Sequence, residues 1–177
     1  MTGAALTVTL DDTGVRRAFA ALQRLMADTT PVMGAIGTGL KRDTHDHMMD
    51  GESPDGTRFA PLLPAYAAIK RGPGILRGAG IPSGLMGSIT RRAGSDSVEV
   101  GTNKVYGAVH QYGATIRPKR ASHLVFALAG GFARARQVTI PARPYLGVGE
   151  GEQRTIVENL VDALDRALAK GNGKDSG

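Results

Sequence analysis

The sequence predicts an α+β domain in which an N-terminal helix pair and a C-terminal helix pack on a mainly antiparallel β-sheet. Apolar residues recur at helical spacing in the first fifty residues and again after residue 150, whereas residues 98–140 contain short β-favouring runs. The chain has 177 residues, the length of one domain with its own core. We therefore expect a single domain over residues 1–170 and a disordered tail over residues 171–177.

Two helices are predicted in the first fifty residues. Residues 6–10 alternate apolar and polar side chains, which is typical of a strand. A first helix then ends near Asp28, and Pro31 suits the first turn of a second helix that runs to about Met49. We expect these helices to pack against a sheet or against each other. The apolar stripe of the first helix is Val15, Phe19, Leu22 and Met26, and that of the second is Val32, Ile36 and Leu40.

Glycine and proline are frequent between residues 51 and 87. Residues 53–56 (Ser-Pro-Asp-Gly) have the chemistry of a turn, and a short helix is predicted over residues 64–70. Residues 71–84 are so rich in glycine that we expect a long mobile loop that does not pack a core. Residues 85–92 are compatible with a short helix or a strand.

Strands and a final helix are predicted in the second half. Residues 98–100 alternate, residues 116–117 precede a proline, and residues 123–128 form a β-favouring run. Gly130-Gly131 can turn this run into a partner strand that ends with residues 137–140. The final helix has one apolar face, formed by Ile156, Leu160, Ala163, Leu164 and Ala167.

Composition excludes several classes of function. The chain contains no cysteine, which excludes disulfides, thiol catalysis and cysteine-ligated metals. It contains no tryptophan and only 5% aromatic residues, which argues against a stacking platform for single-stranded nucleic acid. No apolar run approaches the length that spans a membrane, and the start lacks the features of a signal peptide. We therefore expect no membrane contact and a location in the cytoplasm.

The positive charge is concentrated in one third of the chain. The net charge is +6, and residues 100–149 contain seven basic side chains and no acidic one. One interpretation is a positive face that meets nucleic acid or an acidic protein surface. The other is a strand-rich segment whose exposed faces use arginine. The basic residues are Lys104, Arg117, Lys119, Arg120, Arg134, Arg136 and Arg143.

Catalytic patterns are weak. Asp43, His47 and Asp50 share one face of the second helix, so they are compatible either with a metal site, as in a hydrolase, or with an ordinary polar face. His110 has no serine or aspartate at catalytic spacing, and no phosphate-loop pattern is complete. We therefore expect neither an enzyme nor a bound cofactor or metal.

Four short motifs occur in a specific order. They are Pro-Asp-Gly-Thr-Arg-Phe-Ala-Pro-Leu at residues 54–62, Gly-Leu-Met-Gly-Ser-Ile-Thr at 84–90, Val-Tyr-Gly-Ala-Val-His-Gln-Tyr-Gly at 105–113, and Ile-Pro-Ala-Arg-Pro-Tyr-Leu-Gly at 140–147. This series resembles the phage virion morphogenesis family, which comprises tail completion and head–tail joining proteins of Mu-like and P2-like phages. The resemblance covers roughly residues 45–170.

The chain departs from the family pattern at small or apolar positions. Phe59 stands where a tryptophan is usual, Met48 and Met49 where an aromatic is usual, and Gly107 where an alanine is usual. Such changes affect packing. The glycine-rich stretch at residues 72–84 is longer than the pattern.

The motif residues are candidates for assembly or structural roles. Asp55 and Gly56 form a turn, and Gly113 permits a backbone conformation that other residues avoid. Two prolines stiffen the segment around Arg143, whose guanidinium can bind a carboxylate of a neighbouring subunit or of Glu150 or Glu152 in the same chain. The candidate residues are Asp55, Gly56, Phe59, Tyr106, His110, Gln111, Gly113, Pro141, Arg143 and Pro144.

The resemblance implies a structural protein of a phage or prophage, without enzymatic activity. It would act at the head–tail junction or tail terminus, as a neck or tail-terminator protein in a homo-oligomeric ring, with sixfold symmetry expected. Its partners would be the tail tube or tail terminus and head-completion or neck proteins. It would be found in the host cytoplasm during assembly and then in the virion. We expect the loop at residues 72–84 to order against a neighbour or the tail tube. The alternative function is a basic module that binds DNA through residues 100–149.

Overall fold

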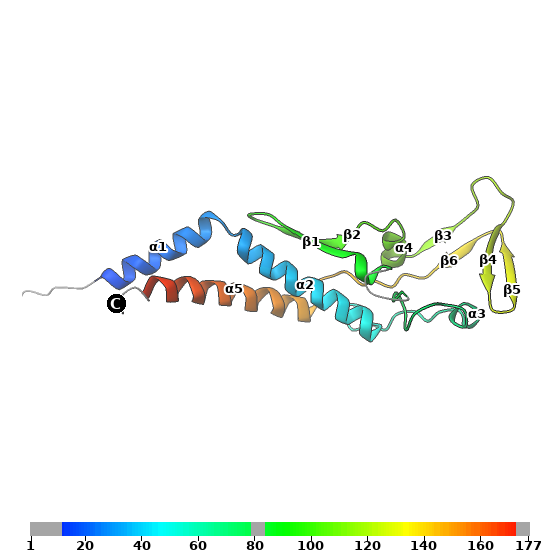
Figure 1. Ribbon diagram of the computed structural model, residues 1–177, viewed down its shortest axis with the longest axis horizontal. Helices are drawn as coiled ribbons and strands as arrows, with labels where there is room; N and C mark the ends of the chain where they lie inside the picture. The colour runs from blue at the N-terminus through cyan, green and yellow to red at the C-terminus, as the bar shows by residue number, and fades with distance from the viewer. Residues whose placement is uncertain (1–11, 79–83, 173–177) are drawn as a thin grey trace, which may run out of the picture.

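The computed structural model describes residues 12–78 and 84–172. The predicted strand at residues 6–10, residues 79–83 of the predicted loop and residues 173–177 of the predicted tail lie outside these ranges. The molecule is elongated, with long helices at one end and a narrow arm of strands at the other (Figure 1). Helices and antiparallel strands are combined in one α+β fold, as predicted.

The N-terminal helix pair and the C-terminal helix form where they were predicted. Helix α1 spans Thr13–Ala27, α2 spans Thr30–Asp50, and α5 spans Glu150–Asn172. Pro31 lies in the first turn of α2, where a missing amide hydrogen breaks no helical bond. Helix α5 lies along both α1 and α2 (Figure 1).

The apolar stripe predicted for α1 is not the face that packs on α5. Ala21 is buried, whereas Val15, Phe19 and Met26 are 57%, 63% and 79% exposed. Helix α1 therefore turns a small side chain inward and leaves three large apolar ones in solvent. The expectation that this helix packs against a sheet or against the second helix was wrong, because α1 packs on α5. Leu22, the fourth residue of the predicted stripe, is half-buried.

The strands form three separate antiparallel ribbons. Strands β1 (Ile89–Ala93) and β2 (Val98–Thr102) pair and lie against α2. A second ribbon pairs β3 (Ala114–Ile116) with β6 (Val138–Ile140), and it leads to the third, β4 (Leu124–Leu128) with β5 (Gly131–Ala135). The last two ribbons make up the arm (Figure 1).

The strand that follows the glycine turn differs from the prediction. Gly130 and Gly131 do turn the chain, but the partner of β4 is β5. Residues 138–140 pair instead with β3. The predicted partner strand was thus placed too far along the chain, because a direct hairpin brings the residues immediately after the turn opposite β4.

The core lies at the middle of the molecule, where α2 meets β1 and the loops. Its buried cluster consists of Met48, Phe59, Leu85, Met86, Ile89 and Tyr145. Ile75 and Leu76 are partly buried and pack against it. The expectation that residues 71–84 do not pack a core was therefore wrong for these two. Lys70 also holds this loop, since its Nζ donates hydrogen bonds to the carbonyls of Arg71, Gly72 and Arg77.

Short helical turns connect the core to the ribbons. They are α3 (Pro64–Ala67), a 3-10 turn at Met86–Ser88, and α4 (Gly107–Tyr112). Residues 85–92 thus contain both predicted alternatives, a helical turn and then a strand. Helix α3 lies beside β4, and the Ala129 amide donates to the Ala65 carbonyl at 2.8 Å. This contact holds the end of the arm.

Candidate functional site

The four sequence motifs converge on the core. Phe59 comes from the first motif, Leu85, Met86 and Ile89 from the second, and Tyr145 from the fourth. The third motif, α4, closes over them: Gly107 is buried, and a Cβ there would lie 2.6 Å from Thr102 Cγ2. An alanine at this position would require Thr102 to move. The motifs therefore build the core of this fold.

The third and fourth motifs are joined by hydrogen bonds. Gln111 Nε2 donates to the Leu146 carbonyl at 2.7 Å, and Gln111 Oε1 accepts from the amides of Tyr145 and Leu146 at 3.1 and 3.0 Å. The Arg143 amide donates to the His110 carbonyl at 2.7 Å. Gln111 therefore uses both ends of its side-chain amide to hold residues 145–146.

Position 113 requires a glycine, both for its backbone conformation and for the close approach of neighbouring atoms. Its φ is +73° and its ψ is 164°, a region that is essentially restricted to glycine. A Cβ at this position would lie 2.9 Å from the Ala142 nitrogen and 3.0 Å from the Ile140 oxygen. The chain leaves α4 and enters β3 through this residue, next to the fourth motif.

Arg143 is buried and binds backbone. Only 4% of the residue is exposed. Its Nε donates to the Ala60 carbonyl at 2.7 Å and one Nη donates to the Pro61 carbonyl at 2.9 Å. The expected ion pair with Glu150 or Glu152 was wrong, because the described residues contain no ion pair of Arg143. The contact to a carboxylate of a neighbouring subunit stays a prediction. Arg143 instead fastens the fourth motif to the segment after Phe59, and its flanking prolines, Pro141 and Pro144, are exposed.

The Asp55–Gly56 turn precedes Phe59. The Gly56 amide donates to the Ser53 carbonyl at 2.8 Å, and the Thr57 amide donates to Asp55 Oδ1 at 2.9 Å. The Thr57 hydrogen bonds lower the pKa of the exposed Asp55 carboxyl. Asp55 and Gly56 thus shape the turn, and Phe59 leaves it to enter the core.

His110 and Tyr106 form an aromatic pair at the edge of α4. Their rings are T-shaped with centroids 6.0 Å apart. His110 Nδ1 is buried without a hydrogen-bond partner among the described residues. Burial, with the Arg143 charge as a second cause, lowers the pKa of His110. The lowered pKa favours the neutral ring.

Asp43 and His47 bind α5. Thr155 Oγ1 donates to Asp43 Oδ2 at 2.7 Å, and His47 Nε2 lies 2.5 Å from Glu152 Oε1. The side chain of Asp50 is exposed at the end of α2. The described residues contain no group of three or more ligands that could hold a metal. The polar helix face predicted as one alternative is thus the joint between α2 and α5.

Glu152 and Thr155 are functional contacts that the motif search missed. Glu152 is 3% exposed, and its Oε2 accepts a hydrogen bond from the Gly149 amide at 2.9 Å. This bond is one half of a capping box, because Gly149 at the cap position has no side chain to return it. A glutamate in the first turn of the predicted helix is the only sequence signal that points to Glu152.

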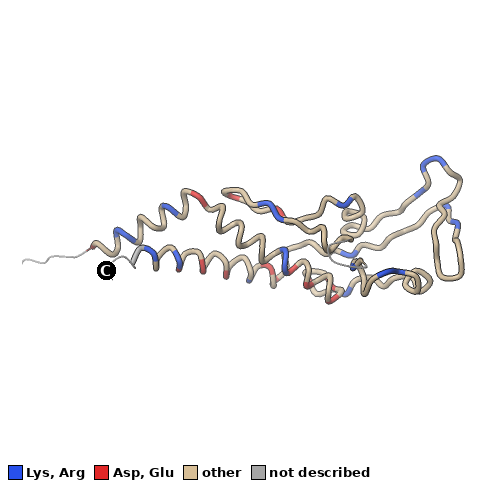
Figure 2. Tube along the Cα trace, viewed as in Figure 1, with Lys and Arg blue, Asp and Glu red and all other residues tan. Residues whose placement is uncertain are grey.

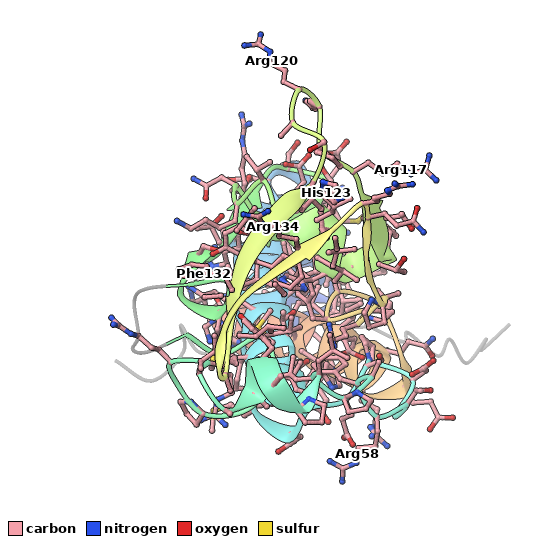
Figure 3. All side chains as sticks on the ribbon, turned by 90° about the vertical axis from the view of Figure 1, so that its right-hand side faces the viewer. Arg58, Arg117, Arg120, His123, Phe132 and Arg134 are labelled. Carbon is pink, nitrogen blue, oxygen red and sulfur yellow. The ribbon has the colours of Figure 1, made fainter. Side chains whose placement is uncertain are left out.

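The arm carries most of the charge of the basic segment. The exposed cations of the arm have no ion-pair partner among the described residues, and they gather around the loop between β3 and β4 and the adjoining end of β5 (Figures 2 and 3). Arg117 donates a hydrogen bond from Nε to Gln137 Oε1 at 3.2 Å. These cations are Arg117, Lys119, Arg120, Arg134 and Arg136. No described helix is long and apolar enough to cross a membrane.

Comparison with known proteins identifies the family. The model of the phage virion morphogenesis family matches residues 10–165. "Mu-like prophage FluMu G protein 2" of Haemophilus influenzae is 35% identical over 78 residues, which are 44% of this chain and 45% of that protein. The match thus spans less than half the length of this relative. No solved structure matches the chain significantly. The chain belongs to the phage virion morphogenesis family and is a structural phage protein.

Proposed function

We propose that this protein completes the phage tail or joins it to the head as a subunit of a homo-oligomeric ring. One observation supports this more than any other. Among the described residues, nine apolar side chains are buried and eighteen large apolar ones are exposed. Scattered exposed apolar residues are ordinary, but rows of them on an elongated chain are typical of surfaces that other subunits cover.

Several of the exposed apolar residues lie near the two ends of the elongated molecule. Val15, Phe19 and Met26 are on α1, and Val125 and Phe132 are on the arm. A ring needs two different faces on each subunit, so that each copy binds the next. Exposed faces at the two ends of this molecule supply them, and sixfold symmetry is the form we propose.

The ring would contact the tail tube or tail terminus on one side and head-completion or neck proteins on the other. We also propose that the protein has no enzymatic activity. Asp43, His47 and Glu152, the acidic and histidine side chains nearest to a catalytic cluster, are engaged in the joint between α2 and α5. Their bonds support a structural role.

Deletion of the gene in the encoding phage or prophage tests this function. Electron microscopy of induced lysates is expected to show filled heads separate from tails, or tails of irregular length. A plasmid copy of the gene should restore joined particles, and antibody labelling should place the protein at the neck or tail end. Normal virions after deletion would contradict the proposal.

A second candidate function is contact with DNA through residues 100–149. The observation that favours it is the group of four exposed arginines and Lys119 on the arm. Binding of this kind falls steeply with salt, because each phosphate contact releases a counterion. Titration of duplex DNA at two salt concentrations tests it: a steep loss of affinity supports it, and an absence of binding at low salt refutes it.

A further inference from the structure

One face of the β4–β5 hairpin combines apolar side chains with a cation. In the antiparallel register, Val125 lies opposite Arg134 and Ala127 opposite Phe132. All four are exposed, Val125 at 61% and Phe132 at 82%. Figure 3 shows Phe132 and Arg134 on this hairpin. Exposed aromatic and arginine side chains are enriched at protein interfaces.

Helix α5 carries the complementary chemistry. Its exposed face has an apolar row, Val157, Val161 and Leu164, at spacings of four and three. An acidic row follows with the same spacings. Val161 is three residues after Glu158 and four before Asp165, so the two rows are neighbours on the helix surface. The acidic row consists of Glu158, Asp162 and Asp165, all of them exposed. Glu158 and Asp165 have no ion-pair partner among the described residues.

The two faces cannot meet within one chain. The hairpin lies at the far end of the arm, whereas α5 runs away from the arm toward the opposite end of the molecule (Figure 1). The opposite side of α5, with the buried Glu152 and Thr155, is the side that packs on the other helices. Any contact between these two faces therefore has to join two different chains.

We propose that the β4–β5 hairpin of one copy docks on the exposed face of α5 of the next copy. Phe132 and Val125 would cover the apolar row, and Arg134 would meet the acidic row. Contact between two different faces is heterologous, and it generates a ring when the rotation closes. The inference rests on the proposed ring and names the surfaces that build it. Phosphate binding alone would not account for Phe132 and Val125 beside Arg134, which favours a protein partner over DNA.

Reversing the charges on the hairpin and on α5, separately and together, tests this contact in the full chain. The arm variant carries Arg134→Glu and Arg136→Glu, the helix variant carries Glu158→Lys and Asp165→Lys, and a third chain combines all four changes. Each single-surface variant should weaken self-association at least roughly tenfold in sedimentation experiments, a loss of about 1.4 kcal/mol. The combined chain should recover most of the association, because the attraction is restored with the signs exchanged.

Matched controls separate this contact from a general charge effect. Lys104→Glu and Asp46→Lys change exposed residues away from both faces, and they should leave association unchanged. Phe132→Ser should weaken association without altering the circular dichroism spectrum of the fold.

Two outcomes overturn the proposal. In the first, both variants assemble as the unmodified chain does; the ring then forms through other surfaces, and the proposed function stands. In the second, the arm variant loses DNA affinity while association is unchanged, which assigns the arm to DNA. If instead the contact is confirmed but deletion of the gene leaves normal virions, the docking stands and the proposed function fails.

Discussion

The side-chain amide of Gln111 pairs with the backbone of Leu146 as a neighbouring strand would. Gln111 Nε2 donates to the Leu146 carbonyl at 2.7 Å, and the Leu146 amide donates to Gln111 Oε1 at 3.0 Å. One side chain thus replaces a strand at the place where α4 meets the segment before α5. The third and fourth motifs are held in register by this pair.

Replacement of Gln111 by alanine is expected to lower the free energy of unfolding by about 2–4 kcal/mol, since three hydrogen bonds are lost at about 1 kcal/mol each. Urea unfolding measures this loss. Gln23→Ala, at an exposed position of α1, is the control and should stay within about 0.5 kcal/mol of the unmodified chain. Equal effects of the two changes would show that the Gln111 pair does not hold the motifs together.

Gly113→Ala is expected to destabilise the fold more than Gly51→Ala. Both glycines have a φ of +73°, but an added Cβ meets backbone atoms at Gly113 and open space at Gly51. We expect a loss of about 1 kcal/mol at Gly51 from the left-handed conformation alone, and of at least about 2 kcal/mol at Gly113. Thermal unfolding of both variants checks the order, and a reversed order would refute the steric argument.

Arg143→Lys is expected to destabilise the isolated subunit. Lysine cannot donate to the Ala60 and Pro61 carbonyls with the fixed fork of a guanidinium, and loss of a charged hydrogen bond at a buried site costs about 2 kcal/mol. Arg117→Lys on the exposed arm serves as the matched control and should change the unfolding midpoint little. An Arg143→Lys chain of unchanged stability that no longer assembles would contradict this structural role and support a contact of Arg143 with a neighbouring subunit.

Acid is expected to destabilise the fold in part through His110. The ordinary pKa of the side chain is 6.5, and burial, with Arg143 as a second cause, lowers the pKa of His110 in the folded chain. Below pH 6.5 the unfolded chain therefore binds the proton first, so the free energy of unfolding decreases as the pH falls.

Urea unfolding between about pH 8 and pH 5 measures this dependence. His110→Leu should lose less stability on acidification than the unmodified chain, whereas His123→Leu, at an exposed position, should behave as the unmodified chain does. Identical pH profiles for the His110 variant and the unmodified chain would contradict the assignment.

Local chemistry was sufficient to predict the long helices, the turn at residues 53–56 and the hairpin glycines. The effect of Pro31 and the apolar periodicity of α2 depend on residues close together in the chain, so the sequence alone reveals them. The packed face of α1 could not be predicted in this way, because α5, from the far end of the chain, is what buries Ala21. In the apolar periodicity of this helix, the small side chain of Ala21 counts for less than the large side chains of Phe19 and Met26, so the pattern indicated the wrong face.

The candidate site shows the same division between local and distant contacts. The motif residues lie together around the core, as the burial of Phe59 and Tyr145 shows. The partners of Arg143, however, are backbone carbonyls more than eighty positions away, and no side-chain pattern marks a carbonyl. The charge of the arm was visible as a segment without acidic residues. The apolar row on its hairpin became apparent only when the register paired Val125 with Arg134 and Ala127 with Phe132.

The mass of the full chain in solution tests the central claim most directly. Light scattering across a range of concentrations, followed by negative-stain imaging of the largest species, measures whether the subunits close on one another. We predict a discrete species, a sixfold multiple of the 18.5 kDa chain, that appears as a ring. A mass that stays at 18.5 kDa at every concentration, with no ring in the images, would contradict the account.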